Sequence, residues 1–154
     1  MKLAQGILCG TWALALPFDW ARQIVDDFQL SPVPKAPSWL LGSTNVDGNI
    51  LPVIDLSLYL GLTTTASAQR QRLLIGGTMD SSSSDSAGDA ICLAFEGLPQ
   101  QLSYDSRPLT YSSALPPRLR ELCTSVGSNA TGHEFLEINT TRLLDALSDE
   151  LSLA

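Results

Sequence analysis

The side chains that most often carry catalysis are scarce in this chain. It has one histidine, His133, which lies between Gly132 and Glu134. A Ser-His-Asp triad would have to use this histidine. No serine lies in the G-x-S-x-G pattern that holds a nucleophile on a sharp strand-to-helix turn. We therefore interpret His133 as a surface residue in a turn and expect no triad.

The sequence also lacks the residue patterns of metal and cofactor sites. The three cysteines, Cys9, Cys92 and Cys123, are far apart in the sequence and form no C-x-x-C pair. Together with one histidine they do not give the spacing of a tetrahedral metal site. The glycine patterns that cradle phosphates are absent, and the isolated pair Gly76-Gly77 indicates a turn at a strand end. We expect no metal and no cofactor.

The neighbouring carboxylates Asp26 and Asp27 are the remaining candidates for acid–base chemistry. Adjacent residues of a strand point to opposite faces, so these two could not act on one substrate together. A small hydrolase on a β scaffold is the alternative from the enzyme class. The lack of a second histidine and of a nucleophile elbow argues against it. We expect a non-catalytic protein that works by binding other proteins.

Composition narrows the class of partner. The chain has 154 residues, of which 44% are hydrophobic and 16% charged, which is typical of a globular protein with one sizeable core. Its net charge of −7 argues against nucleic acid and against an anionic membrane surface. The apolar stretch near the start is broken by Gly10 and Thr11, so we expect no signal segment and no direct membrane insertion. Dispersed cysteines without a disulfide framework indicate a reducing cytoplasm.

The elements that would position any site are mostly short strands. The apolar run Trp12–Leu16 ends at Pro17, and Gln23–Val25 predicts a second strand. Asp47-Gly48 between β-type residues predicts a hairpin, because both turn positions need a positive φ. Pro52 belongs at a sheet edge or a bulge, since it cannot donate to a ladder.

A short helix and a final helix complete the expected elements. Asp55 is a suitable N-cap for a helix over 56–60 that Gly61 ends. Further strands are predicted around 73–75, over 90–95, over 97–104 and over 134–138. We expect loops or turns at Pro108, Pro116 and Pro117, and a flexible loop over Asp80–Asp89. Asn139 or Thr140 caps the last helix, whose apolar face is made of Leu143, Leu144, Leu147 and Leu151.

The three tryptophans, Trp12, Trp20 and Trp39, all lie in the first forty residues. Large aromatic side chains usually pack in a core. They are also enriched at binding hot spots, so a recognition surface is the second interpretation.

The stretch from Gly10 to Leu62 resembles the CheW-like domain, the coupling module of bacterial chemosensory systems. Residues 33–42, VPKAPSWLLG, are similar to the family pattern V-P-x-A-P-x-x-h-x-G. Residues 44–56, TNVDGNILPVIDL, follow directly and are similar to N-h-R-G-x-h-h-P-V-h-D-L. Later segments around 73–75, 91–98 and 135–144 resemble the family's last strands and final helix. The resemblance therefore spans almost the whole chain.

The resemblance implies a mostly β fold of two small five-stranded SH3-like barrels packed side by side, with a short mid-chain helix and a C-terminal helix. It implies one CheW-like domain over residues 1–154. It also implies a non-catalytic cytoplasmic adaptor that couples a methyl-accepting chemoreceptor to a CheA-type histidine kinase. In this family the receptor's helical tip lies in an apolar groove between the barrels. The implied partner-binding residues are Gln23, Ile24, Asn45, Val46, Asp47, Gly48, Ile50 and Val53.

Two positions depart from the family pattern. Asp47 stands where the family usually has Arg, and Gln23 where it often has Glu. A charge inversion at the rim of an interface changes which partner is accepted. The inversion favours a specialised partner, such as the chemosensory pathway of type IV pili and twitching motility. The alternative function is a divergent CheW-like scaffold that localises a pilus or motility component without coupling to a kinase.

Overall fold

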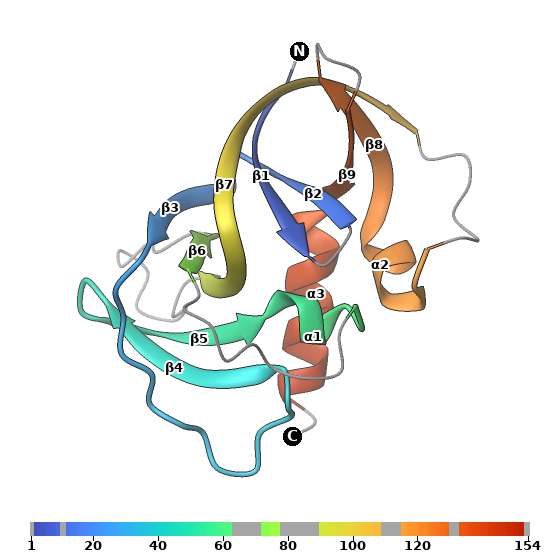
Figure 1. Cartoon of the computed structure of the whole chain (residues 1–154). Coiled ribbons are helices and arrows are strands. Elements are labelled where there is room, and N and C mark those ends of the chain that lie inside the picture. The colour runs from blue at the N-terminus through green and yellow to red at the C-terminus, as the bar shows by residue number, and fades with distance from the viewer. Residues whose placement is uncertain are drawn as a thin grey trace.

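A computed structural model describes residues 2–9, 12–62, 72–77, 90–108, 115–129 and 133–152 (Figure 1). The chain is mostly β, as predicted. The elements are β1 (Lys2–Cys9), β2 (Trp12–Pro17), β3 (Ala21–Val25), β4 (Leu40–Val46), β5 (Asn49–Asp55), α1 (Leu56–Tyr59), β6 (Arg72–Gly76), β7 (Ile91–Pro108), α2 (Pro117–Leu122), β8 (Cys123–Asn129), β9 (Glu134–Ile138) and α3 (Thr140–Ser152). The predicted loop at Asp80–Asp89 lies outside the described residues.

The first sheet closes into a five-stranded barrel. Its strand order is β1-β2-β9-β8-β7, and β1 pairs with β7 as well as with β2. The β2–β9 pairing is parallel and aligns Leu14 with Leu136. A small interior cluster, with Tyr104 and Leu102 at its centre, is buried inside. Closure leaves this barrel without a free strand edge.

Among the described residues, the second sheet has the order β3-β6-β7-β5-β4 and ends at β3 and β4, and only the isolated bridge of Ser31 to Ser43 lies on the edge of β4. Its own buried cluster includes Val53, Leu73 and Ile75. Pro52 fits in β5 because the ladder to β7 begins only at the next residue, Val53. The missing N–H of Pro52 therefore leaves no strand partner unsatisfied.

One long strand belongs to both sheets. β7 runs for 18 residues, pairing with β5 and β6 near its start and with β1 and β8 further on (Figure 1). The sequence predicted two separate strands here, which is wrong. The strand continues through a bulge in its pairing with β1. Between the pairs Gly6–Gln100 and Leu8–Glu96, β1 advances by two residues and β7 by four. Gly97 and Pro99 lie within that bulge, so they bend the strand without ending it.

Three elements were not expected from the sequence. α2 begins at Pro117, although the prolines predicted a loop, because the first turn of a helix needs no N–H donor. β8 is rich in small polar residues, and only its pairing with β7 and β9 makes it a strand. β1 overlaps the apolar stretch near the start, for which the sequence predicts no strand. The two predicted helices are present as α1 and α3.

The largest hydrophobic cluster joins the two sheets. It contains Leu16 from the first, Leu93 from the shared strand, and Leu143 and Leu147 from α3, which lies between the sheets in Figure 1. Asn139 caps α3, since its Oδ1 accepts the N–H of Arg142 at 3.1 Å. The cap and the Leu143/Leu147 face of the last helix are therefore confirmed.

The tryptophans all contact this central cluster. Trp20 is buried, whereas Trp12 and Trp39 are partly exposed. Trp39 makes an edge-on contact with Tyr59 at 5.0 Å between ring centroids. Core packing is therefore confirmed for Trp20, and the other two combine packing with an exposed edge.

Candidate functional site

The β4–β5 hairpin has the turn that the sequence predicted. Asp47 and Gly48 have φ values of 53° and 88°, the positive values that a two-residue hairpin turn of this kind needs. The Oδ1 atom of Asn45 accepts the N–H of Gly48 at 2.9 Å. The Asn45 side chain therefore fixes the turn, and the exposed Asp47 carboxylate makes no hydrogen bond or ion pair within the described residues.

The predicted partner-binding residues separate into exposed and buried groups. At the hairpin, Ile50 is 67% exposed, and the exposed neighbours are Asn45, Asp47 and Gly48. Val46 and Val53 point instead into the core of the second sheet, at 8% and 0% exposure. A partner can therefore contact the exposed hairpin residues directly, whereas the two valines pack in the core beneath the hairpin.

Gln23 and Ile24 come from the other end of the second sheet. Both belong to β3, which pairs with β6, so no strand pairing joins them to the hairpin. Gln23 is exposed, and Ile24 is partly buried against the central cluster. The predicted site therefore lies on the two open edges of one sheet.

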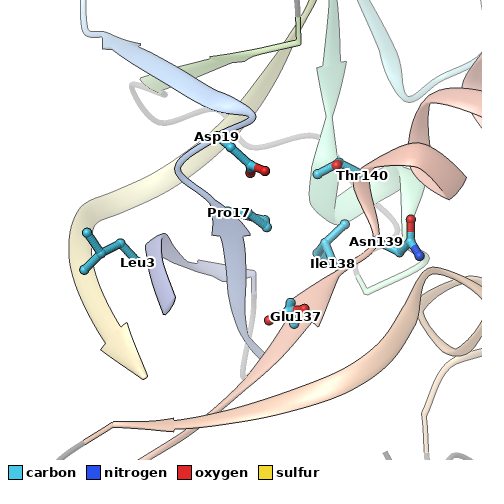
Figure 2. A pocket seen from close by; sticks show the side chains of 7 residues that line it. All are labelled: Leu3, Pro17, Asp19, Glu137, Ile138, Asn139 and Thr140. Atoms are coloured by element: carbon cyan, nitrogen blue, oxygen red, sulfur yellow. The ribbon is translucent and has the colours of Figure 1, made fainter. Parts of the chain in front are cut away.

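A separate cavity of about 410 Å³ lies where β2 leaves the first barrel and β9 runs into α3 (Figure 2). Its walls are Leu3, Pro17, Asp19, Glu137, Ile138, Asn139 and Thr140. Two of these residues are acidic and none is basic. No pattern in the sequence predicts this cavity, because its walls are far apart in the chain and come together through the pairings of β2 with β1 and with β9.

A buried tyrosine holds one of the cavity's carboxylates. The hydroxyl of Tyr104 donates to Oε2 of Glu137 at 2.6 Å. Burial raises the pKa of Tyr104 above its ordinary value, and the hydrogen bond to Glu137 and the charges of Glu137 and Asp19 raise it further. Tyr104 therefore stays protonated and serves as a fixed donor to Glu137.

The thiols are unsuited to nucleophilic chemistry. Cys9, Cys92 and Cys123 are all buried and unpaired. Burial raises the pKa of Cys9 and of Cys92 to about 11 and that of Cys123 to about 12. Because the thiolate is the reactive form, these side chains act as small core residues.

The other candidates for chemistry lie on the surface. His133 is exposed just before β9, as the sequence predicted. Asp26 and Asp27 follow the end of β3 and do not lie on a strand, which corrects the expectation, and Asp26 forms an ion pair with Arg72 of β6 at 3.0 Å. Within the described ranges, no group of three or more His, Cys, Asp or Glu residues is placed to hold a metal ion.

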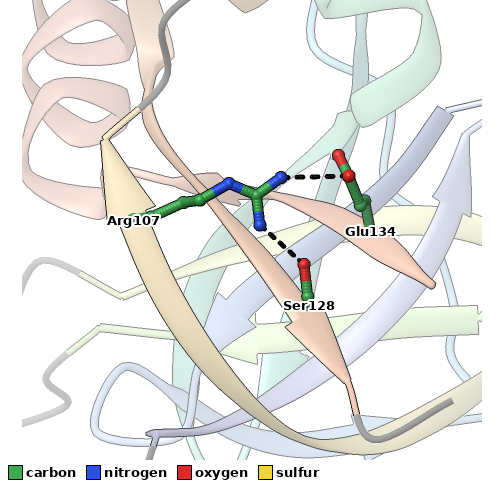
Figure 3. A network of polar contacts seen from close by, with 3 residues as sticks. All are labelled: Arg107, Ser128 and Glu134. Carbon is green, nitrogen blue, oxygen red and sulfur yellow. Dashed lines mark hydrogen bonds and ion pairs between the residues drawn. The ribbon is translucent and has the colours of Figure 1, made fainter. Parts of the chain in front are cut away.

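The outer face of the first barrel carries a polar network. Arg107 of β7 donates to Oγ of Ser128 at 2.8 Å and to Oε1 of Glu134 at 3.0 Å (Figure 3). Through these two hydrogen bonds, the arginine connects β7 to both β8 and β9. Since Arg107 and Glu134 are both more than half exposed, the network fixes strand register more than it adds stability.

Comparisons with known proteins agree with this geometry. The family model for the CheW-like domain matches residues 6–148. The chain belongs to the CheW-like domain family.

Individual proteins are similar to it as well. Protein FrzA of Myxococcus xanthus is 32% identical over 69 residues, which cover 45% of this chain and 43% of that protein. The crystal structure of the scaffolding protein TtCheW from Thermoanaerobacter tengcongensis superimposes with a TM-score of 0.71 at 16% identity, covering 89% of this chain and 88% of that one.

Membership of the CheW-like family confirms two expectations. Proteins of this family are non-catalytic scaffolds in chemosensory signalling, so the enzyme alternative is set aside. The closed barrel and the second five-stranded sheet correspond to the two-barrel fold that the resemblance implied. No helix in the described part of the chain is long and apolar enough to cross a bilayer.

Proposed function

We propose that this chain is a cytoplasmic adaptor that couples a methyl-accepting chemoreceptor to a CheA-type histidine kinase. The observation that carries the proposal is the CheW-like match over residues 6–148, together with a second sheet that ends at β3 and β4 and carries an exposed β4–β5 hairpin turn. Proteins of this family act as adaptors between receptors and this kind of kinase. The whole chain, as one CheW-like domain, would bind both partners and place the kinase under control of the receptor.

The hairpin is the part of the surface that we assign to partner binding. Ile50 is a large apolar side chain on a strand, yet it is mostly exposed. Exposed apolar side chains that a partner covers are typical of binding surfaces. Val46 is a poor position for testing this assignment, since a charge there would damage the core of the second sheet.

The test is a reconstituted signalling complex. The wild-type chain is mixed with a CheA-type kinase and a chemoreceptor signalling fragment, and kinase autophosphorylation is measured. We expect the chain to make kinase activity depend on the receptor fragment. Ile50→Asp should abolish that dependence. Leu8→Asp is the matched control, because Leu8 is 60% exposed on β1 of the first barrel, and it should have no effect.

The same assay distinguishes the coupling function from a second candidate function. The alternative is a divergent CheW-like scaffold that localises a pilus or motility component without kinase coupling, and the inverted charge at Asp47, which changes which partner is accepted, is compatible with it. Such a scaffold would leave kinase activity independent of the receptor and would not co-sediment with the kinase. Either result with well-folded wild-type protein would reject the coupling function.

A further inference from the structure

The C-terminal end of α3 lacks the residues that usually stabilise such an end. Its last turn contains no basic residue, whereas Asp149 and Glu150 place two carboxylates there. The C-terminal end of a helix carries a partial negative charge, so acidic side chains in the last turn are repelled and cations are attracted. The sequence of α3 therefore disfavours its own last turn.

The compensating cation comes from another helix. Arg118 lies in the first turn of α2, and its guanidinium donates to both carboxylate oxygens of Glu150, at 2.5 Å to Oε1 and at 3.2 Å to Oε2. A pair of N–H···O bonds is the strongest arrangement that an arginine and a carboxylate can form. The arginine therefore balances the charge of Glu150 and places a cation close to the end of α3.

The first turns of α3 are held by a hydrogen bond and by apolar packing. The N–H of Asn139, the cap residue, donates to the carbonyl of Leu122 at the end of α2, at 2.8 Å. Leu143 and Leu147 are almost completely buried in the central cluster. These contacts keep the first part of the helix in the core and do not involve its last turn.

The last turn has a weaker kind of support. Ser148 and Asp149 are exposed, and Glu150 is partly buried. The side chains of Arg118 and Glu150 are 35% and 34% exposed, so water reaches their ion pair. A pair that water reaches is worth less than a core contact, and it can break while the core stays intact.

The same arginine covers a buried aromatic ring. Its guanidinium carbon lies 4.2 Å from the ring centroid of Tyr59 in α1, and Tyr59 in turn meets Trp39 edge-on. Tyr59 is only 2% exposed, and its burial, more than any nearby charge, raises its pKa to about 12. Arg118 therefore helps to keep the ring of Tyr59 away from water.

A groove of about 330 Å³ lies beside this ring, where α1 meets α2. Trp39 and Tyr59 line it together with Pro117 and Arg118. α1 follows β5 of the second sheet and α2 leads into β8 of the first, so the groove is at the joint between the two sheets. Because Arg118 is part of its wall, a movement of that side chain changes how much of the aromatic surface is accessible.

We propose that Arg118 and Glu150 form a latch at the joint between the two sheets. When the latch is closed, it holds the last turn of α3 in helical form and keeps Tyr59 covered. When it opens, that turn is released and the ring of Tyr59 becomes accessible from the groove, while the rest of α3 stays in the core. The inference concerns the folded chain alone and does not rest on the proposed function.

Amide hydrogen exchange of the full chain, followed residue by residue by NMR, tests the latch. Arg118→Gln should speed exchange over 149–152 about fivefold and leave exchange over 143–147 unchanged. In a chain that already carries Glu150→Gln, the same arginine change should have an effect of less than about twofold, because its partner is gone. The matched control is Arg107→Gln, which removes another arginine–glutamate pair and should leave exchange in α3 unchanged.

Quenching of tryptophan fluorescence by acrylamide tests the cover over the groove. Arg118→Gln should increase the quenching, because Trp39 lines the groove that the latch closes. The increase should disappear when Trp39→Phe is added, since Trp12 and Trp20 do not line this groove. Quenching that does not respond to Arg118→Gln would contradict the proposed cover.

The exchange measurement has three outcomes that would overturn the latch. Unchanged exchange over 149–152 in Arg118→Gln would show that the last turn does not need the arginine. An equal increase over the whole of α3 would show that the helix leaves the core as one unit. Additive effects of Arg118→Gln and Glu150→Gln would show that the two side chains act independently.

Discussion

The two sheets share β7 but differ in closure. The first sheet returns on itself because β1 pairs with both of its neighbours, whereas the second ends at β3 and β4. All the residues that we assign to partner binding belong to the open sheet. A closed barrel has no edge to offer, so it suits a stable support. An open sheet leaves edge strands and a projecting hairpin accessible, which suits recognition.

The two sheets are nevertheless built with the same packing device. In the first, the ring of Tyr104 lies on Gly127, where a Cβ would come within 2.1 Å of the ring. In the second, the ring of Trp20 lies on Gly76, where a Cβ would come within 2.2 Å. Both contacts need a residue without a side chain. The sheets therefore differ in their edges more than in how their interiors are packed.

The largest effect should come from the shared strand. Leu93 is fully buried in the central cluster, so Leu93→Ala should lower the free energy of unfolding by about 3–4 kcal/mol. Because β7 belongs to both sheets, far-UV circular dichroism and tryptophan fluorescence should report one coincident transition in urea. Two separate transitions would show that the sheets unfold independently and would contradict the shared-core description.

The glycine contacts should follow in size. Gly127→Ala and Gly76→Ala should each cost about 2 kcal/mol, since the added methyl group meets a buried ring. The control is Gly48→Ala in the hairpin turn, where no atom lies within 4 Å of the added Cβ and only the positive φ is strained. It should cost about 1 kcal/mol. Equal losses at all three positions, measured by urea unfolding, would argue against the ring contacts.

Titration of the buried thiols should have no effect near neutral pH and should appear only above pH 9. Their pKa values are about 11 to 12 in the folded chain, above the ordinary value of 9.0, so the folded state holds these protons more tightly. Their contribution to stability is full below pH 9 and is lost as pH rises through about 11. We expect the free energy of unfolding to fall over this window. Cys92→Ala should make the fall shallower, and an unchanged slope would contradict the assignment.

The smallest effect should come from the outer face of the first barrel. Arg107→Ala removes an exposed ion pair with Glu134 and should cost about 0.5 kcal/mol. Arg118→Ala should cost about twice as much. Its guanidinium contacts both carboxylate oxygens of Glu150, at 2.5 and 3.2 Å, and lies 4.2 Å from the ring centroid of Tyr59. Thermal unfolding of the two variants side by side measures the ratio, and the reverse order would contradict this reading.

Local signals in the sequence predicted local structure well. The Asp47-Gly48 turn, the Asp55 cap and the face of α3 depend on neighbouring residues, and all three are present. The family pattern extended that success to the mostly β fold, with a closed five-stranded barrel beside a second five-stranded sheet. For the site, the sequence predicted the hairpin but not which of its residues are buried. Val46 and Ile50 are both apolar strand residues beside the turn, yet Val46 faces the core and Ile50 faces solvent.

Apart from α2, whose start at Pro117 is a local feature, the failures concern tertiary pairing. β8 has little apolar alternation, and strands on both sides hold it in place. The break expected in β7 is a bulge against β1, which no property of residues 97–99 alone reveals. The acidic cavity and the crossing at Ser31 likewise join segments distant in sequence. Such features depend on register, and register is set by the whole sheet.

Hydrogen–deuterium exchange of the full chain, alone and with a chemoreceptor signalling fragment and a CheA-type kinase, tests most directly whether the open sheet is the recognition surface. We expect partners to slow exchange over β3 and over the hairpin at 45–50. Exchange over β8 and β9 of the closed barrel should stay as it is in the free chain. Slowed exchange confined to β1, β2, β8 and β9, with the hairpin unchanged, would contradict the division between a closed support and an open recognition sheet.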